Sequence, residues 1–234
     1  MQARQEVDPR HLWSVEALSG RELRCLLERA RRLRHEPAQA PLRGRNLALL
    51  CEGEPDESAR ALQRAARELG AQVATLRASD TCPDGHTVDQ ATVRLLGRLY
   101  DAIDCHGLGE PQVEIIAREA GIPVFNGLGE RDRPARSLAA LLGVLERSGK
   151  PLEALQLGYV GDPGSDCARR WARLAATGGL VLRQVDAPEA LHDDVDLLID
   201  ARNGQPVLSP AMPPDQREAD RRVTLQAMLM TTMA

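Results

Sequence analysis

A continuous apolar run, Asn46-Leu-Ala-Leu-Leu-Cys51, constrains the fold of this 234-residue chain more than any other stretch. Strands that are covered on both faces have such runs, whereas half-exposed strands alternate apolar and polar residues. The run is followed by a short loop and by Asp56, a residue type that often caps helices. Strand and helix patterns alternate in this way along the chain, which predicts an α/β fold with parallel sheets covered by helices.

Two such units are expected, with a boundary at Gly149-Lys-Pro151. Residues 1–148 are predicted to form the first domain and residues 149–234 a shorter second domain. The second unit is barely long enough for an independent core. We therefore expect its last helix, about residues 215–230, to pack back on the first domain.

Local signals give finer predictions. Ser19-Gly-Arg-Glu22 and Thr87-Val-Asp-Gln90 have the spacing of capping boxes, so each is expected to begin a helix. A strand is predicted over Ile122–Phe125, and Asn203–Pro214 is predicted to be a proline-rich loop. The turn Gly161–Asp166 lacks a full G-x-G-x-x-G pattern, which argues against nucleotide binding there.

Composition argues against several classes of protein. The aromatic content is 2% and the net charge is −4, which disfavours nucleic-acid binding. The sequence has no apolar run of membrane-spanning length and no signal-peptide pattern. Five scattered cysteines suggest reduced thiols in the cytoplasm, and Cys105 is expected to be buried. No cofactor is expected, and no spacing suggests a metal site.

The loop after the first apolar run combines two opposing features. The carboxyl end of such a strand, followed by a helix N-terminus, is where α/β proteins bind anions. Yet this loop carries four carboxylates and a single cation, Arg60. An anion site full of carboxylates is contradictory, and any functional interpretation has to resolve the contradiction. The carboxylates are Glu52, Glu54, Asp56 and Glu57.

The order of segments resembles the aspartate/ornithine transcarbamylase family along nearly the whole length. Pro41-Leu-Arg-Gly-Arg-Asn-Leu-Ala-Leu-Leu50 is similar to the family's PLKGKTLALIF, and Asn126-Gly-Leu128 leans toward the ornithine members. Gly158-Tyr-Val-Gly-Asp162 resembles the strand that opens the second domain, and Arg221–Leu229 resembles the closing helix. The resemblance implies two Rossmann-like domains with the second abridged, a trimer with shared active sites, and carbamoyl phosphate and an amino acid as substrates.

The family's phosphate loop is poorly preserved. Its Pro-Ser-Thr-Arg-Thr-Arg motif falls on Pro55–Arg60, of which only Pro55 and Arg60 match. Ser58 stands where the resemblance places a phosphate-binding arginine, and Asp56 and Glu57 stand where it places hydroxyl residues.

Other site positions of the family have also changed. An arginine of the family falls on His106, and its His-Pro-x-Gln motif falls on Arg133-Pro-Ala-Arg136. The loop that brings a lysine from a neighbouring subunit falls near Asp84-Gly85, which has no lysine, and the amino-acid loop of the second domain is missing. Ser209–Pro213 resembles a remnant of the family's His-Cys/Pro-Leu-Pro turn.

The anion-binding candidates are Ser58, Arg60, Arg133 and Arg136, and the catalytic candidates are His106, Arg133 and Arg136. In one interpretation Arg133 and Arg136 pair with Asp56 and Glu57 and fill the vacated pocket. In the other, the cleft still accepts an anion with a different arrangement of cations.

The leading functional hypothesis is a catalytically inactive relative of the transcarbamylases. It would act as a binding, scaffold or regulatory subunit, either as a homotrimer or with an active homologue, and with a small anionic ligand. One alternative is a divergent transferase that uses Arg60, Arg133, Arg136 and His106 on carbamoyl phosphate or another anionic substrate. Another is a structural assembly protein that has kept the fold only for its oligomer surface.

Overall fold

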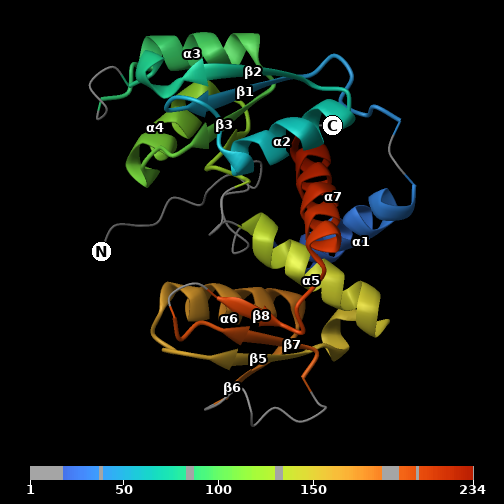
Figure 1. Ribbon diagram of the computed structural model, residues 1–234. Coiled ribbons are helices and arrows are strands. Elements are labelled where there is room, and N and C mark those ends of the chain that lie inside the picture. Colours follow the sequence, from blue (N-terminus) through green and yellow to red (C-terminus); the bar gives the residue numbers. More distant parts are fainter. Residues whose placement is uncertain are drawn as a thin grey trace.

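The computed structural model describes residues 18–36, 39–82, 87–129, 134–185, 195–203 and 206–233. Two four-stranded sheets make up its β-structure, and Figure 1 shows one in the upper half and one in the lower half, with helices between them. None of the helices in these ranges is long and apolar enough to cross a membrane.

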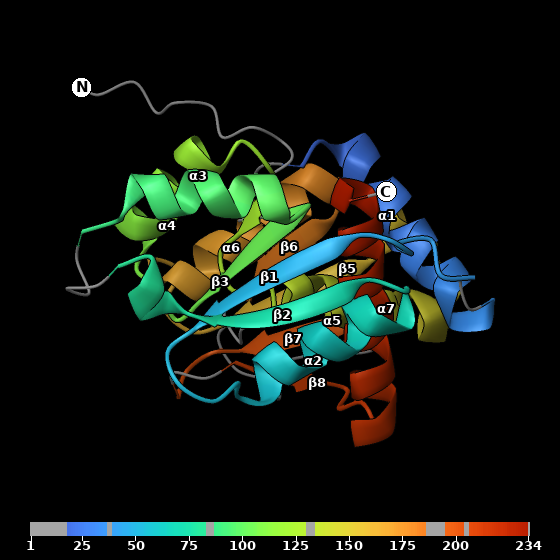
Figure 2. The same ribbon diagram turned by 90° about the horizontal axis from the view of Figure 1, so that it is seen from above.

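Sheet A is parallel throughout, in the order β2-β1-β3-β4. Figure 2 shows β1 between β2 and β3, and the pairing of β1 with β3 brings Cys51 beside His106 at the carboxyl ends of the strands. The elements of this half are α1 (Gly20–His35), β1 (Asn46–Cys51), α2 (Glu57–Glu68), β2 (Gln72–Arg77), η2 (Ala78–Asp80), α3 (Gln90–Leu99), β3 (Ala102–His106), α4 (Glu110–Ala120) and β4 (Val124–Phe125).

The apolar run that forms β1 is covered on both faces, as predicted. Leu47 and Leu49 belong to the core cluster that includes α1, α2 and α7. Ala48 and Leu50 point the other way, into a second cluster built from α3 and α4. Alternate residues of a strand face opposite sides, so a strand between two helical layers has to be apolar throughout.

Sheet B has the order β6-β5-β7-β8, in which β8 is antiparallel to β7. The helix α6 follows β5, and α7 follows β8 and ends the described chain. The elements of this half are α5 (Pro134–Ser148), η3 (Leu152–Ala154), β5 (Gln156–Val160), α6 (Asp166–Gly178), β6 (Val181–Gln184), β7 (Leu197–Asp200), β8 (Val207–Ser209) and α7 (Pro214–Met233).

The helix α7 packs against α1, α2 and α5, and Figure 1 shows these helices at the level between the two sheets. One hydrophobic cluster contains residues from both halves, among them Leu49, Leu157 and Leu229. The expected domain boundary falls between α5 and η3, and the division into residues 1–148 and 149–234 stays a prediction.

Several local predictions are confirmed and several are wrong. The capping box Ser19–Glu22 is present in full. Thr87 does not cap α3; Asp89 does, because its carboxylate accepts the N–H of Ala91. The strand predicted over residues 122–125 is only Val124–Phe125. The predicted loop 203–214 contains β8, whose three residues are held by pairing with β7.

Gly97 on α3 gives a test of helix packing against intrinsic helix propensity. A Cβ at this position would lie 2.0 Å from the backbone oxygen of Ala120 on α4. Gly97→Ala should therefore lower the free energy of unfolding by about 1–3 kcal/mol, although alanine favours helices. Urea unfolding measures this change, with the exposed neighbour Arg98→Ala as a control expected to stay within about 0.5 kcal/mol. A stabilised Gly97→Ala variant would contradict the close approach of α3 and α4.

Candidate anion site at the start of helix α2

Asp56 caps helix α2 and occupies the end of the helix where an anion would bind. Its Oδ1 accepts the N–H of Ala59 at 2.8 Å. The same oxygen lies 3.2 Å from Nε2 of His106, which ends the neighbouring strand β3. Burial alone would raise the pKa of Asp56, but the bond from Ala59 and the attraction of His106 hold that pKa below its ordinary value. The chain's own carboxylate therefore takes a backbone donor that a bound anion would need.

Arg221 of α7 reaches the position where the resemblance implies an arginine on α2. Its Nη2 donates to Oγ of the buried Ser58 at 3.0 Å and to the backbone oxygen of Gly129 at 2.5 Å. A Cβ on Gly129 would lie 2.5 Å from the oxygen of Ser58, so the loop after β4 is close to α2 here. Burial lowers the pKa of Arg221, and the nearby carboxylate of Glu57 opposes that shift. The side chain stays cationic, because a guanidinium keeps its charge in proteins.

These residues lie on a cleft of about 840 Å³. Among the described residues that line it, seven are arginines and three are carboxylates. Two of the carboxylates are already paired, Glu218 with Arg64 and Asp220 with Arg34. The charged lining residues are Arg60, Arg64, Arg136, Arg147, Arg217, Arg221, Arg222, Glu57, Glu218 and Asp220.

The structure brings together part of the predicted site. Ser58, Arg60 and Arg136 line the cleft, whereas His106 is not among the described residues that line it. Arg60 turns back on its own loop, with Nε donating to the oxygen of Pro55 at 2.8 Å. Arg133 lies outside the described residues, as does the Asp84-Gly85 loop.

The expected pairing of Arg136 with Asp56 or Glu57 is not what the structure contains. Within the described ranges Arg136 forms no ion pair, and the partner of Asp56 is His106. The physical reason is the strand order: β3 lies next to β1, so His106 ends beside the loop that carries Asp56. Arg133, the other arginine of this interpretation, lies outside the described residues.

Arg221 was not among the predicted site residues. Its stretch was expected only to form the closing helix, and helical periodicity does not tell which cleft a side chain enters. The one available signal was Ser58, a small residue where the resemblance implies an arginine. The space left by the missing side chain can be filled by an arginine from another element, as Arg221 does here.

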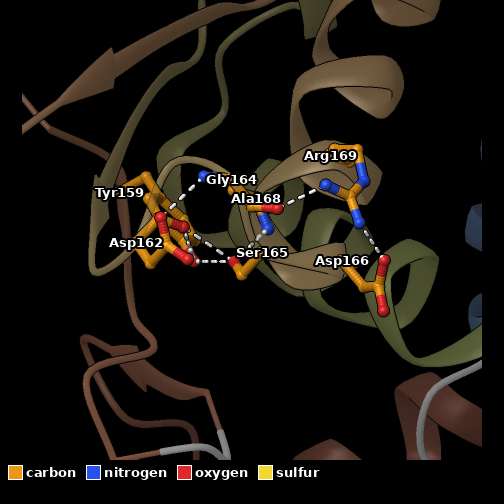
Figure 3. Close-up of polar contacts among 7 residues, drawn as sticks. All are labelled: Tyr159, Asp162, Gly164, Ser165, Asp166, Ala168 and Arg169. Carbon is orange, nitrogen blue, oxygen red and sulfur yellow. Dashed lines mark hydrogen bonds and ion pairs between the residues drawn. The ribbon is translucent and has the colours of Figure 1, made fainter.

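The turn after β5 is held by its own side chains, as Figure 3 shows. The Ser165 hydroxyl caps α6 by accepting the N–H of Ala168 at 3.1 Å, and it lies 2.9 Å from the hydroxyl of Tyr159. Asp162 accepts the N–H of Gly164 at 2.9 Å, and Arg169 contacts Gly164 and Asp166. Donors that a phosphate would need at this turn are therefore already used.

The cysteines near the site are not suited to nucleophilic chemistry. Burial raises the pKa of Cys51 to about 11, with the charges of Asp104 and Asp56 adding to the shift. Cys105 is fully buried as expected, and burial raises its pKa well above the ordinary value. The thiolate is the reactive form, so both groups are inert at neutral pH. No cluster of three or more His, Cys, Asp or Glu residues in the described part of the chain could hold a metal ion.

Asp56→Asn tests the charge at the start of α2, because Asn and Asp are equally good N-caps. The folded pKa of Asp56 is lowered, so its charge stabilises the fold above the ordinary Asp pKa and loses that effect as pH falls. At pH 6 the variant should be less stable by a few tenths to about 1 kcal/mol, since the side chain is exposed. Urea unfolding from pH 6 downward should show the difference begin to shrink near pH 4, the ordinary Asp range, and vanish only as pH falls through the lowered folded pKa. A difference that persists in acid would contradict this assignment.

Comparisons with known proteins agree on one family. Residues 10–146 match the family model described as "Aspartate/ornithine carbamoyltransferase, carbamoyl-P binding domain". The catabolic ornithine carbamoyltransferase of Pseudomonas putida is 36% identical over 193 residues, which cover 80% of this chain and 57% of that protein. The ornithine carbamoyltransferase of Cutibacterium acnes is 34% identical over 193 residues, covering 81% of this chain and 58% of that protein.

Solved structures have the same fold. Ornithine carbamoyltransferase from Thermus thermophilus superposes with a TM-score of 0.77 at 21% identity, covering 97% of this chain and 100% of that one. The catalytic subunit of aspartate transcarbamoylase from M. jannaschii gives a TM-score of 0.71 at 14% identity, covering 96% and 97%. The chain spans 57–58% of the length of the Pseudomonas putida and Cutibacterium acnes proteins. With the family model matched over more than half of its length, the chain belongs to the aspartate/ornithine carbamoyltransferase family.

Proposed function

We propose that this chain is a binding or regulatory member of the carbamoyltransferase family that does not transfer carbamoyl groups efficiently. One observation carries the proposal: Asp56 occupies the N-terminus of α2 with its own carboxylate and pairs there with His106. In the resemblance, this is where the phosphate of carbamoyl phosphate is cradled. Here the position is already filled by a negative charge.

Repulsion from carboxylates should weaken the binding of the doubly negative carbamoyl phosphate. A carboxylate about 4 Å from a phosphate opposes it by roughly 1–4 kcal/mol at effective dielectrics between 80 and 20. Asp56 and Glu57 both stand at this end of α2, and Glu57 lines the cleft. Transfer also needs donors that strengthen as charge develops on the reacting group, and a bidentate arginine is a stronger donor than serine.

An anion site of a different kind is consistent with the remaining cations. Arg221 is already fixed by Ser58 and Gly129, and Arg136 lines the same cleft. We propose that Ser58, Arg60, Arg136 and Arg221 form this site, with Arg133 as a further candidate. Its ligand would be a small anion that keeps clear of Asp56 and Glu57.

We further propose that the chain works in the cytoplasm as a homo-oligomer, with a trimer as the expectation, or together with an active homologue. The support is the family membership and the similarity to relatives such as the catabolic ornithine carbamoyltransferase of Pseudomonas putida. The division into residues 1–148 and 149–234 is part of the same proposal.

The second candidate function is a divergent carbamoyltransferase of the ornithine type, or a transferase for another anionic substrate. The size of the cleft, about 840 Å³, and its seven described arginines favour this candidate. A catalytic role for His106 would require access to this cleft, and His106 is not among the described residues that line it.

Side-by-side assays separate the two candidates. With carbamoyl phosphate and ornithine, the protein should form no citrulline above a protein-free blank. In calorimetric titration, phosphonoacetyl-ornithine should bind at least about a hundredfold more weakly than to the Pseudomonas putida relative measured alongside, because two carboxylates oppose it. Citrulline formation at a rate comparable to that of the relative would establish the divergent transferase instead.

Glu57→Gln removes the carboxylate that faces Arg221 in the cleft. The affinity for phosphonoacetyl-ornithine should rise by about three- to tenfold, since one repulsive charge of roughly 1 kcal/mol is lost. Glu54→Gln is the matched control, because Glu54 lies exposed on the same loop and does not line the cleft. Equal effects of the two substitutions would mean that only the overall charge of the loop matters.

A further inference from the structure

The helix α7 carries a fully buried carboxylate, Asp220, immediately before Arg221. Its partner is the guanidinium of Arg34 near the end of α1, with which it forms an ion pair. A buried ion pair seldom stabilises a fold more than apolar residues of the same volume would. The stability of the helix contact therefore does not account for the charge at this position.

The surroundings of Asp220 hold it tightly. Gly143 of α5 lies so near that a Cβ there would be 2.8 Å from Oδ2 of Asp220. Met212, in the segment that leads into α7, reaches the same glycine. Asp220 thus lies where α1, α5 and α7 meet, on the edge of the cleft.

Asp220 is also the first residue of α7 that is fully buried. The preceding residues of the helix, 214–219, are exposed or partly exposed. The ion pair in this stretch, Arg64 with Glu218, is at the surface, and such pairs contribute little. Arg221 follows Asp220 directly, so its backbone position depends on how this residue is held.

We propose that the Arg34–Asp220 pair is a positioning device that fixes the rotation of α7 and so aims Arg221 at Ser58 and Gly129. Asp220 and Arg221 are adjacent on α7 and make their contacts in different directions, Asp220 with Arg34 and Arg221 with Ser58 and Gly129. A rotation of α7 about its axis that moved Arg221 would therefore break the ion pair. Arg34 and Asp220 do not touch the ligand in this proposal; they act through Arg221.

The experiment follows Arg221 directly. Its ¹⁵N–¹H Nε–Hε signal is identified by its loss in Arg221→Lys. The variants are Asp220→Asn and the charge-free pair Arg34→Met with Asp220→Leu, which removes the ion pair without leaving a buried unpaired charge. Glu146→Gln is the matched control, because Glu146 pairs with Arg31 of the same helix α1 at 2.7 Å but lies on α5. Thermal melting monitors the stability of each variant.

In both Asp220 variants the Arg221 signal should move toward the positions of exposed arginines, and affinity for inorganic phosphate should fall about tenfold. Glu146→Gln should change neither, whatever it does to the melting temperature. In an Arg221→Met background, Asp220→Asn should not reduce phosphate affinity further, since the effect passes through Arg221.

A charge-free pair with the wild-type Arg221 signal would overturn the positioning role and leave Arg34–Asp220 as an ordinary helix contact. The phosphate readout rests on the proposed anion cleft, whereas the spectrum does not. If the wild-type protein binds no phosphate, the anion site is refuted, and the Arg221 signal alone still decides the positioning role.

Discussion

The packing of α7 is the constraint on which the rest of the structure depends. Its residues from Val223 to Leu229 are all buried, so the helix is covered on every face rather than along one stripe. It contacts α1, α2 and α5, although it follows sheet B in the chain. Helices that are apolar or buried all round belong in the interior of a fold. This helix therefore joins the two halves. Residues near its beginning, including the exposed Arg217 and the partly buried Arg221, line the cleft.

Local patterns were enough to predict most elements, because their causes lie within a few residues. The apolar run of β1 and the caps Ser19 and Asp56 are examples. The cap of α3 was misplaced because Thr87 and Asp89 both have suitable side chains, and only the path of the backbone selects Asp89. Strand β8 was missed because its three residues are held by pairing with β7, and such short segments have little periodicity of their own.

The candidate site was harder to predict than the fold, because it is assembled from elements far apart in the chain. Ser58 and Arg221 are 163 residues apart, and their hydrogen bond depends on how α7 crosses α2. The partner of Asp56 depends on strand order, which places β3 beside β1 and His106 beside the loop. Sequence reasoning identified the excess of carboxylates at the start of α2 but did not predict that His106 pairs with Asp56. Counting charged residues along the sequence predicts the net charge near the start of α2. Which residues pair with one another depends on the order of the strands, which the sequence pattern does not give.

At two of the strand-to-helix junctions, those of α2 and α6, a side chain of the chain itself caps the helix N-terminus. Asp56 takes the N–H of Ala59 on α2, and Ser165 takes that of Ala168 on α6. Recognition of an anion by backbone N–H groups is weakened at these junctions, so guanidinium groups have to supply it. Fixing a long side chain on binding costs roughly 0.5–1.5 kcal/mol. Arg221 is already held by Ser58 and Gly129 before any ligand arrives, and it therefore loses less freedom than an arginine without such bonds. In the proposed anion site, preorganisation rather than the number of arginines favours Arg221 as the cation that binds the ligand.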